Sequence, residues 1–133
     1  MKYLLDTNIC VFLIRRKSAT VLTRFGQFGI DELGVSAVTL AELRYGADKS
    51  RRPEQNHAAL DEFLVPLAVV DFDSQAAAHY GRLRAELERR GTPIGPLDTM
   101  IAAAALSLGV PLVTNNTAEF SQVPGLRVED WTR

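Results

Sequence analysis

The chain contains a single cysteine, Cys10, so it cannot form an internal disulfide or a multi-cysteine zinc module. Long hydrophobic runs are also missing. The longest wholly apolar stretch, residues 100–106, is far shorter than the roughly 18 residues that a membrane span requires. Neither sign of charge predominates, because the 15 Lys and Arg residues are nearly balanced by 16 Asp and Glu residues. The net charge of -1 excludes a binder that relies on overall charge, although a local basic surface is still possible.

Several nucleotide-binding and catalytic motifs are absent. There is no Walker A loop, no Gly-x-Gly-x-x-Gly and no Gly-x-Ser-x-Gly elbow. The two histidines, His57 and His79, fall on the expected surfaces of helices and receive no role. The first residues do not form a signal-peptide pattern, because Asp6 follows only two leucines. We therefore expect a cytoplasmic protein with one domain over residues 1–133. A chain of this length can bury a hydrophobic core without disulfides or structural metal ions.

Hydrophobic patterning predicts an α/β protein in which strands and helices alternate. Apolar runs predict strands at residues 3–5, 33–36, 67–72, 111–114 and, less regularly, 126–129. Helical patterns lie between them, at residues 9–16, 20–28, 38–47, 53–64, from Asp73 or Ser74 to Gly91, and 97–108. Helices between strands imply crossover connections, and hence a mostly parallel sheet of four to five strands. Chemistry is then expected at the carboxyl ends of the strands.

Asp98 is the most informative carboxylate, because the helix that carries it is apolar nearly all round. Such a helix belongs in the interior of the fold, and no basic residue lies one turn from Asp98. The helix dipole contributes only roughly 0.3–1 kcal/mol at the first turn. Burial of an unpaired charge costs several kcal/mol. Either the carboxylate faces a cleft, or a cation lies against it.

Glu42 and Asp6 are two further candidates. No cation lies within one turn of Glu42 on its mostly apolar helix face, so the side chain either binds something or turns to solvent beside Tyr45. Asp6 follows the first predicted strand and, taken alone, is best explained as the N-cap of the next helix. Ile9 stands where a capping box would require Glu or Gln.

Asn116 and Glu119 follow the fourth predicted strand, where a turn and an exposed loop are the simplest interpretations. Together with Asp6, Glu42 and Asp98, however, they could converge on one edge of a parallel sheet. Oxygen ligands without His or Cys suit Mg²⁺ or Mn²⁺ and not zinc.

Four segments resemble the acidic motifs of PIN-domain ribonucleases, in order along almost the whole chain. They are Leu5–Asn8, Ser36–Gly46, Pro96–Ala103, and Leu112–Asn116 followed by Glu119 and Phe120. Within that family the chain resembles the VapC toxins of bacterial type II toxin–antitoxin modules. The stretches Gly91–Pro96 and Val128–Trp131 are similar to the branch directed at initiator tRNA.

This resemblance implies a PIN-like three-layer α/β/α sandwich and a Mg²⁺-dependent endoribonuclease. Asp6, Glu42 and Asp98 would form the acidic triad, with Asp6 and Asp98 as metal ligands. The fourth motif leaves two alternatives for the fourth position of the site: either Asn116 holds a metal-bound water, or Glu119 supplies the acid. Metal-activated water would cleave structured RNA, such as the anticodon loop of initiator tRNA, to 5′-phosphate and 3′-hydroxyl ends and so inhibit translation.

The resemblance also implies partners. A VapB-type antitoxin would neutralise a homodimer, in a heterotetramer or larger complex without membrane association. The apolar residues of Val11–Ile14 and Val21–Leu22 exceed what one helix face can bury, so they belong either to an antitoxin groove or to the core. Basic groups at Arg15–Lys17 and Lys49–Arg52 are candidates for RNA backbone contacts, unless they are only solvated helix ends.

Three other functions remain open. The first is a house-keeping PIN-fold ribonuclease, which an antitoxin reading frame upstream of the gene would distinguish from a toxin. The second is another α/β metal-dependent phosphohydrolase. Haloacid-dehalogenase-like enzymes need a second Asp where this chain has Asn8, which counts against them. The third is a non-catalytic interaction domain, which the intact Asp6, Glu42 and Asp98 disfavour.

Overall fold

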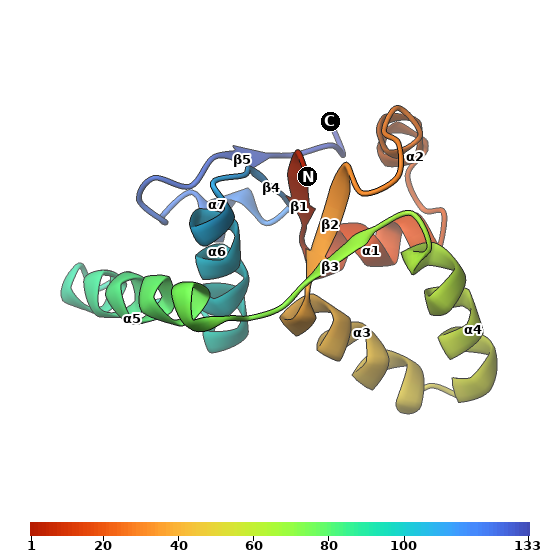
Figure 1. The fold of residues 1–133 in the computed structure, drawn as a ribbon, viewed down its shortest axis with the longest axis horizontal. Coiled ribbons are helices and arrows are strands. Elements are labelled where there is room, and N and C mark those ends of the chain that lie inside the picture. Colours follow the sequence, from red (N-terminus) through yellow and green to blue (C-terminus); the bar gives the residue numbers. More distant parts are fainter.

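A five-stranded parallel sheet lies at the centre of the protein (Figure 1). The computed structural model describes all of residues 1–133. The strands are β1 (Tyr3–Leu5), β2 (Leu33–Ser36), β3 (Ala68–Val70), β4 (Leu112–Val113) and β5 (Val128–Glu129), in the order β3-β2-β1-β4-β5. Every neighbouring pair is parallel. The predicted sandwich with a parallel sheet is therefore confirmed, at the upper end of the expected number of strands.

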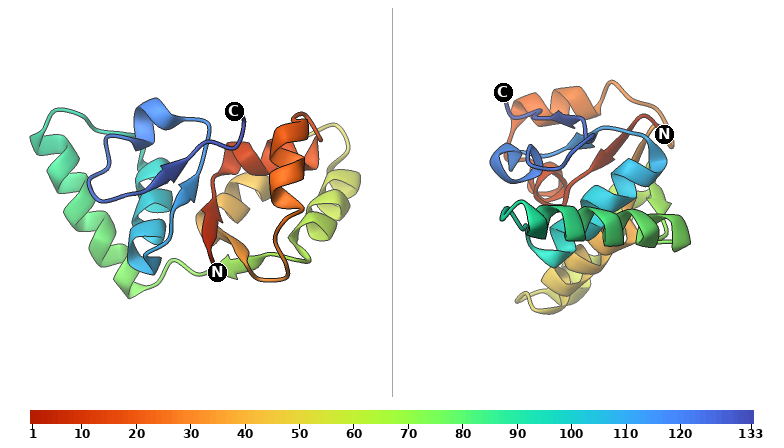
Figure 2. Two further views of the ribbon diagram at one scale, coloured as in Figure 1. Left: turned by 90° about the horizontal axis from the view of Figure 1, so that it is seen from above. Right: turned by 90° about the vertical axis from the view of Figure 1, so that its left-hand side faces the viewer.

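Helices cover both faces of the sheet. They are α1 (Thr7–Ile14), α2 (Ala19–Phe25), α3 (Ala37–Asp48), α4 (Pro53–Leu64), α5 (Ser74–Arg89), α6 (Pro96–Leu108) and α7 (Thr117–Phe120). The pair α5 and α6 lies on one side of the sheet and α1, α2 and α4 lie on the other (Figures 1 and 2). Helix α3 begins directly after β2 and packs against both α4 and α6. None of the helices combines the length and apolarity needed to cross a bilayer.

Strand β1 contributes side chains to two separate cores, because successive side chains point to opposite faces of a sheet. Leu4 and Leu5 of β1 are both fully buried, yet Leu4 packs with the α5–α6 side and Leu5 with the α1–α4 side. Helix α6 is buried without a break from Ile101 to Ala105, as its apolar composition predicts. Its alanines allow close approach to the sheet and to α5, and this central position fixes Asp98 at the helix's first turn.

Helix ends follow the expected capping chemistry, with small shifts in the bounds. Asp73 caps α5 by accepting a hydrogen bond from the backbone N–H of Ala76 at 2.9 Å. Gly109 ends α6 in the left-handed conformation, with φ of 69°. The predicted helices at residues 9–16 and 20–28 were placed too late, since α1 and α2 begin at Thr7 and Ala19, directly after their caps.

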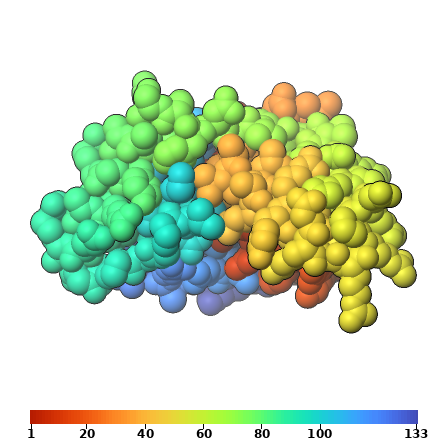
Figure 3. Space-filling view, turned by 90° about the horizontal axis from the view of Figure 1, so that it is seen from below, coloured from red at the N-terminus to blue at the C-terminus, as the bar shows by residue number.

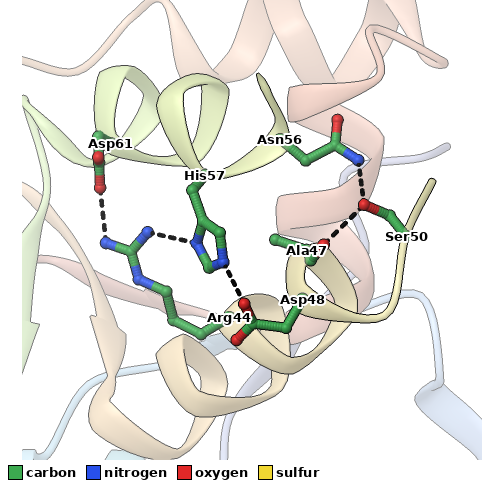
Figure 4. Close-up of polar contacts among 7 residues, drawn as sticks. All are labelled: Arg44, Ala47, Asp48, Ser50, Asn56, His57 and Asp61. Atoms are coloured by element: carbon green, nitrogen blue, oxygen red, sulfur yellow. Dashed lines mark hydrogen bonds and ion pairs between the residues drawn. The ribbon is translucent and has the colours of Figure 1, made fainter. Parts of the chain in front are cut away.

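His57, for which the sequence predicts no catalytic or metal-binding role, makes polar contacts that join α3 to α4 (Figure 4). Arg44 donates hydrogen bonds to His57 Nδ1 at 3.0 Å and to Asp61 Oδ1 at 2.6 Å. Since arginine can only donate, Nδ1 must accept, and the ring proton lies on Nε2. That nitrogen lies 2.8 Å from Asp48 Oδ1. The chain of polar contacts ties the two helices together and directs Arg44 toward α4.

We predict that Arg44→Ala lowers the free energy of unfolding by about 1–2 kcal/mol, because His57 and Asp61 both lose a charged hydrogen-bond partner. Urea denaturation at pH 7 measures the effect. Arg82→Ala is the matched control, since Arg82 lies exposed on α5 without a salt bridge, and its change should stay within about 0.5 kcal/mol. Equal losses for the two variants would contradict the tethering role.

Candidate active site

The sequence-predicted acids come from four places in the chain and lie at the carboxyl edge of the sheet. Asp6 follows β1, and Thr114 follows the adjacent strand β4. Glu42 lies on α3, Asp98 on the first turn of α6 and Glu119 on α7. Figure 3 shows α3 (orange), the start of α6 (cyan), the start of α1 (red) and the segment after β4 (blue) meeting on one face.

Asp6 is both a helix cap and the innermost of these acids. Its side chain is only 3% exposed. Oδ1 accepts a hydrogen bond from the backbone N–H of Thr7 at 2.8 Å, and Oδ2 accepts one from the hydroxyl of Thr114 at 2.7 Å. Burial raises the pKa of Asp6, the two hydrogen bonds oppose this rise, and the charges of Glu42 and Glu119 add to it. The carboxylate is thus fixed in position but disfavoured as an isolated charge.

Glu42 is held by the hydroxyl group of Thr7, with no cation. Thr7 Oγ1 donates to Glu42 Oε1 at 2.7 Å and lies 3.2 Å from Thr39 Oγ1. Thr7 therefore joins Asp6 and Glu42, through its backbone N–H on one side and its hydroxyl on the other. Glu42 is partly exposed, and one of its carboxylate oxygens accepts the hydrogen bond from Thr7.

Asp98 is half-buried, and its pKa is raised to about 7. Burial is the largest cause of the raised pKa, followed by a hydrogen bond with the carboxyl group of Glu119 and by the charge of Glu119. The charges of Asp6 and Glu42 raise this pKa further. The four carboxyl groups are therefore close enough to repel one another, so they constitute one site.

Glu119 does not lie in the exposed loop that the sequence suggested. It lies on the short helix α7, where it accepts a hydrogen bond from the side-chain amide of Asn116. Its other carboxylate oxygen accepts the backbone N–H of Gly95 at 3.2 Å. Asn116 is in turn anchored by its own backbone N–H, which donates to Thr114 Oγ1 at 3.0 Å. Asn116 and Gly95 thus direct Glu119 toward Asp98.

No cation of the protein compensates these acids. All eight ion pairs of the chain join other residues, and none includes Asp6, Glu42, Asp98 or Glu119. Four interacting carboxyl groups without a basic partner form a donor set suited to a hard divalent cation. No three acidic, histidine or cysteine side chains stand in an arrangement that could hold one ion directly. A divalent cation at this site would therefore be held by one or two of these carboxylates together with water.

Comparison with known proteins assigns the family. The family model described as "PIN domain" matches residues 3–126. This chain belongs to the PIN-domain family.

Within the family the chain is most usefully compared with VapC proteins. It is 51% identical over 132 residues, or 99% of both chains, to the tRNA(fMet)-specific endonuclease VapC of Shigella flexneri. It is 49% identical, over 98% of both chains, to the Salmonella typhimurium protein of the same name. The crystal structure of DNA-bound VapBC from Salmonella typhimurium contains a chain that matches with a TM-score of 0.94 and 49% identity, over 98% of both chains. This PIN domain is therefore a ribonuclease of the VapC type.

The sequence did not predict that two threonine hydroxyl groups hold the acids of this PIN domain in place. Thr7 and Thr114 lie within the segments that resemble family motifs, yet no role was predicted for either of them. The signal was weak, because a threonine after a strand or at the start of a helix is common. Their contacts depend on the register between β1 and β4 and on how α1 packs against α3, which the sequence does not state.

Asp98→Asn should stabilise the metal-free protein increasingly as pH rises. The folded state keeps a proton on Asp98 up to a pH of about 7, whereas the ordinary pKa is 3.8. Between these pH values the unfolded state releases this proton whereas the folded state retains it, so the free energy of unfolding falls as pH rises. Asparagine does not titrate and removes that loss. At about 1.4 kcal/mol per pKa unit, we expect a gain of about 1–3 kcal/mol at pH 8 and a smaller gain at pH 5.

Urea denaturation in EDTA at both pH values measures this difference. Glu62→Gln is the control, because Glu62 is exposed on α4 and outside the acid cluster. An Asp98→Asn variant with the same pH dependence as the parent would show that Asp98 is not confined among the other acids.

Proposed function

We propose that this protein is a Mg²⁺-dependent endoribonuclease toxin that cleaves the anticodon loop of initiator tRNA, in the cytoplasm, and so inhibits translation. The location of the cleavage site is supported by one observation, the cluster of four carboxyl groups without any basic partner. The substrate rests on the relatives from Shigella flexneri and Salmonella typhimurium, whose names specify tRNA(fMet).

Asp6 and Asp98 are the proposed ligands of the divalent cation. Asp6 is fixed from two sides by Thr7 and Thr114, so it offers a preorganised carboxylate at the carboxyl end of β1. Asp98 faces the same space from the first turn of α6. When bound, Mg²⁺ would polarise the phosphodiester and lower the pKa of an attacking water.

The remaining residues orient the reacting groups. Glu42, held by Thr7, can accept a hydrogen bond from the attacking water. Glu119 completes the acidic site next to Asp98, and Asn116 orients Glu119. We thus favour Glu119 over Asn116 for the fourth position, because Glu119 adds a carboxyl group next to Asp98, whereas the Asn116 amide N–H donates to Glu119 and orients it. Since water and not the ribose 2′-hydroxyl attacks, the products carry 5′-phosphate and 3′-hydroxyl ends.

A VapB-type antitoxin is the proposed partner. Related chains occur in VapBC complexes, including VapBC2 of Rickettsia felis bound to a promoter DNA fragment, with a TM-score of 0.91 and 40% identity over 98% of this chain and 99% of that chain. Val11, Phe12, Ile14 and Leu22 are only partly buried beside the core, so they leave apolar surface for an antitoxin helix. We further propose that the toxin is a homodimer and forms a heterotetramer or larger complex with the antitoxin.

Two alternatives have less support. A house-keeping ribonuclease of the same fold would share the acid cluster, but relatives at 51% and 49% identity carry the VapC name. A phosphohydrolase of another α/β family is disfavoured by the match to the PIN domain over residues 3–126.

Asp6→Asn, Glu42→Gln and Asp98→Asn should each slow cleavage of initiator tRNA by about 100-fold or more, because each removes a charge that binds the cation or orients the water. Expression of the parent should stop growth and expression of Asp98→Asn should not. Mapping of the cleaved ends should give 5′-phosphates in the anticodon loop, and EDTA should abolish them. Glu62→Gln serves as the control with parental activity.

Products with 2′,3′-cyclic phosphate ends would refute the mechanism, and intact initiator tRNA beside another cleaved RNA would refute the substrate.

Glu119→Gln and Asn116→Ala separate the two candidates for the fourth position. If Glu119 completes the site, Glu119→Gln should raise the Mg²⁺ concentration for half-maximal activity by about 10-fold or more. Asn116→Ala should raise it only about two- to threefold, because it loosens Glu119 without removing a charge. Cleavage rates over a Mg²⁺ titration measure both values. A larger shift for Asn116→Ala than for Glu119→Gln would assign the fourth position to Asn116.

A further inference from the structure

A cleft of about 270 Å³ opens beside the acid cluster, between α1, α3 and α4. Thr7 and Glu42 line the cleft and belong to the acid site as well. Arg15 and Lys49, one from the end of α1 and the other from the end of α3, line the same cleft. The fold thus places two cations from distant parts of the sequence in one space that is continuous with Glu42.

The basic residues that lack an ion-pair partner are concentrated around this cleft. Of the 15 Lys and Arg residues, seven form salt bridges with carboxylates: Lys2, Arg24, Arg44, Arg84, Arg89, Arg90 and Arg133. Six of the other eight belong to residues 15–17 and 49–52, the segments that contribute Arg15 and Lys49. The overall charge is -1, so this local surplus of positive charge belongs to the two segments that reach the cleft and not to the whole protein.

Both cations are well placed by their helices. Arg15 and Lys49 are the C-cap residues of α1 and α3, where the partial negative charge of a helix end favours a cation. The Lys49 ammonium lies 5.0 Å from the centre of the Tyr45 ring. The turn that follows Lys49 is fixed by Ser50, which donates to the carbonyl of Ala47 at 2.6 Å and accepts from Asn56 at 2.8 Å (Figure 4).

We propose that Arg15 and Lys49 together bind a phosphate of the RNA backbone next to the scissile bond, and we call this pair the phosphate clamp. This inference rests on the acid cluster as the cleavage site. If the scissile phosphate of an RNA strand lies at the acid cluster, a neighbouring phosphate can enter the cleft that Glu42 also lines. The carboxylates and the two helix ends repel that phosphate, and the unpaired cations offset the repulsion. Contacts of this kind position the strand without reading its sequence, so they serve any RNA that the site accepts.

Arg15→Gln, Lys49→Gln and the double variant test the clamp. Binding is measured in the Asp98→Asn background by fluorescence anisotropy with a fluorescein-labelled single-stranded RNA of mixed sequence. Each substitution should raise Kd about 5- to 10-fold, and should reduce the slope of log Kd against log salt concentration by about one. In the cleavage-competent protein, KM for initiator tRNA should rise about 5- to 10-fold for each substitution while kcat changes less than about threefold.

Arg82→Gln is the matched control, because Arg82 is exposed and unpaired on α5, outside the cleft. An equal loss of RNA binding in Arg82→Gln and the clamp variants would overturn the proposal. So would a double variant that binds RNA like the parent, including one that loses only affinity for the antitoxin. Reduced binding of the mixed-sequence RNA would support the clamp even if the parent did not cleave initiator tRNA, a result that would reject only the proposed substrate.

Discussion

Mutual repulsion among carboxyl groups is the constraint on which the site depends. Burial and neighbouring acids raise the pKa of Asp98 to about 7 and also raise the pKa of Asp6, and no lysine or arginine pairs with either residue. A protein selected only for stability would not collect these groups, because replacing one with a neutral amide removes the repulsion. The cation that we propose for this site would remove the same repulsion.

The parallel sheet makes this concentration of charge possible. Adjacent parallel strands end at the same edge, so Asp6 after β1 and Thr114 after β4 lie within hydrogen-bonding distance. Helix α6 brings Asp98 to that edge because its alanines allow it to lie buried against the sheet and α5. The hydroxyls of Thr7 and Thr114 hold the carboxylates without neutralising them. Rigid placement and retained charge are both properties that a metal-dependent site requires.

The distribution of positive charge complements that of the acids. Arg84, Arg89 and Arg90 on α5 and Arg44 on α3 pair with carboxylates, whereas the basic residues of segments 15–17 and 49–52 form no salt bridge. Arg44 is of particular interest, because it lies only two residues from Glu42 and yet is directed to α4. The fold thereby keeps a nearby cation away from the acid cluster and leaves free cations in the adjoining cleft.

The sequence by itself determined the order of strands and helices, the parallel sheet, the buried helix that carries Asp98 and the family, because these follow from local periodicity, caps and short motifs. It also nominated Asp6, Glu42 and Asp98, since no basic residue stands one turn from the latter two. Only the tertiary structure decided that Glu119 lies on a helix and faces Asp98, that Thr7 and Thr114 fix the acids, and that Arg15 and Lys49 share one cleft. These relations join residues far apart in the chain, and their distances depend on strand register and helix packing, which no local pattern encodes.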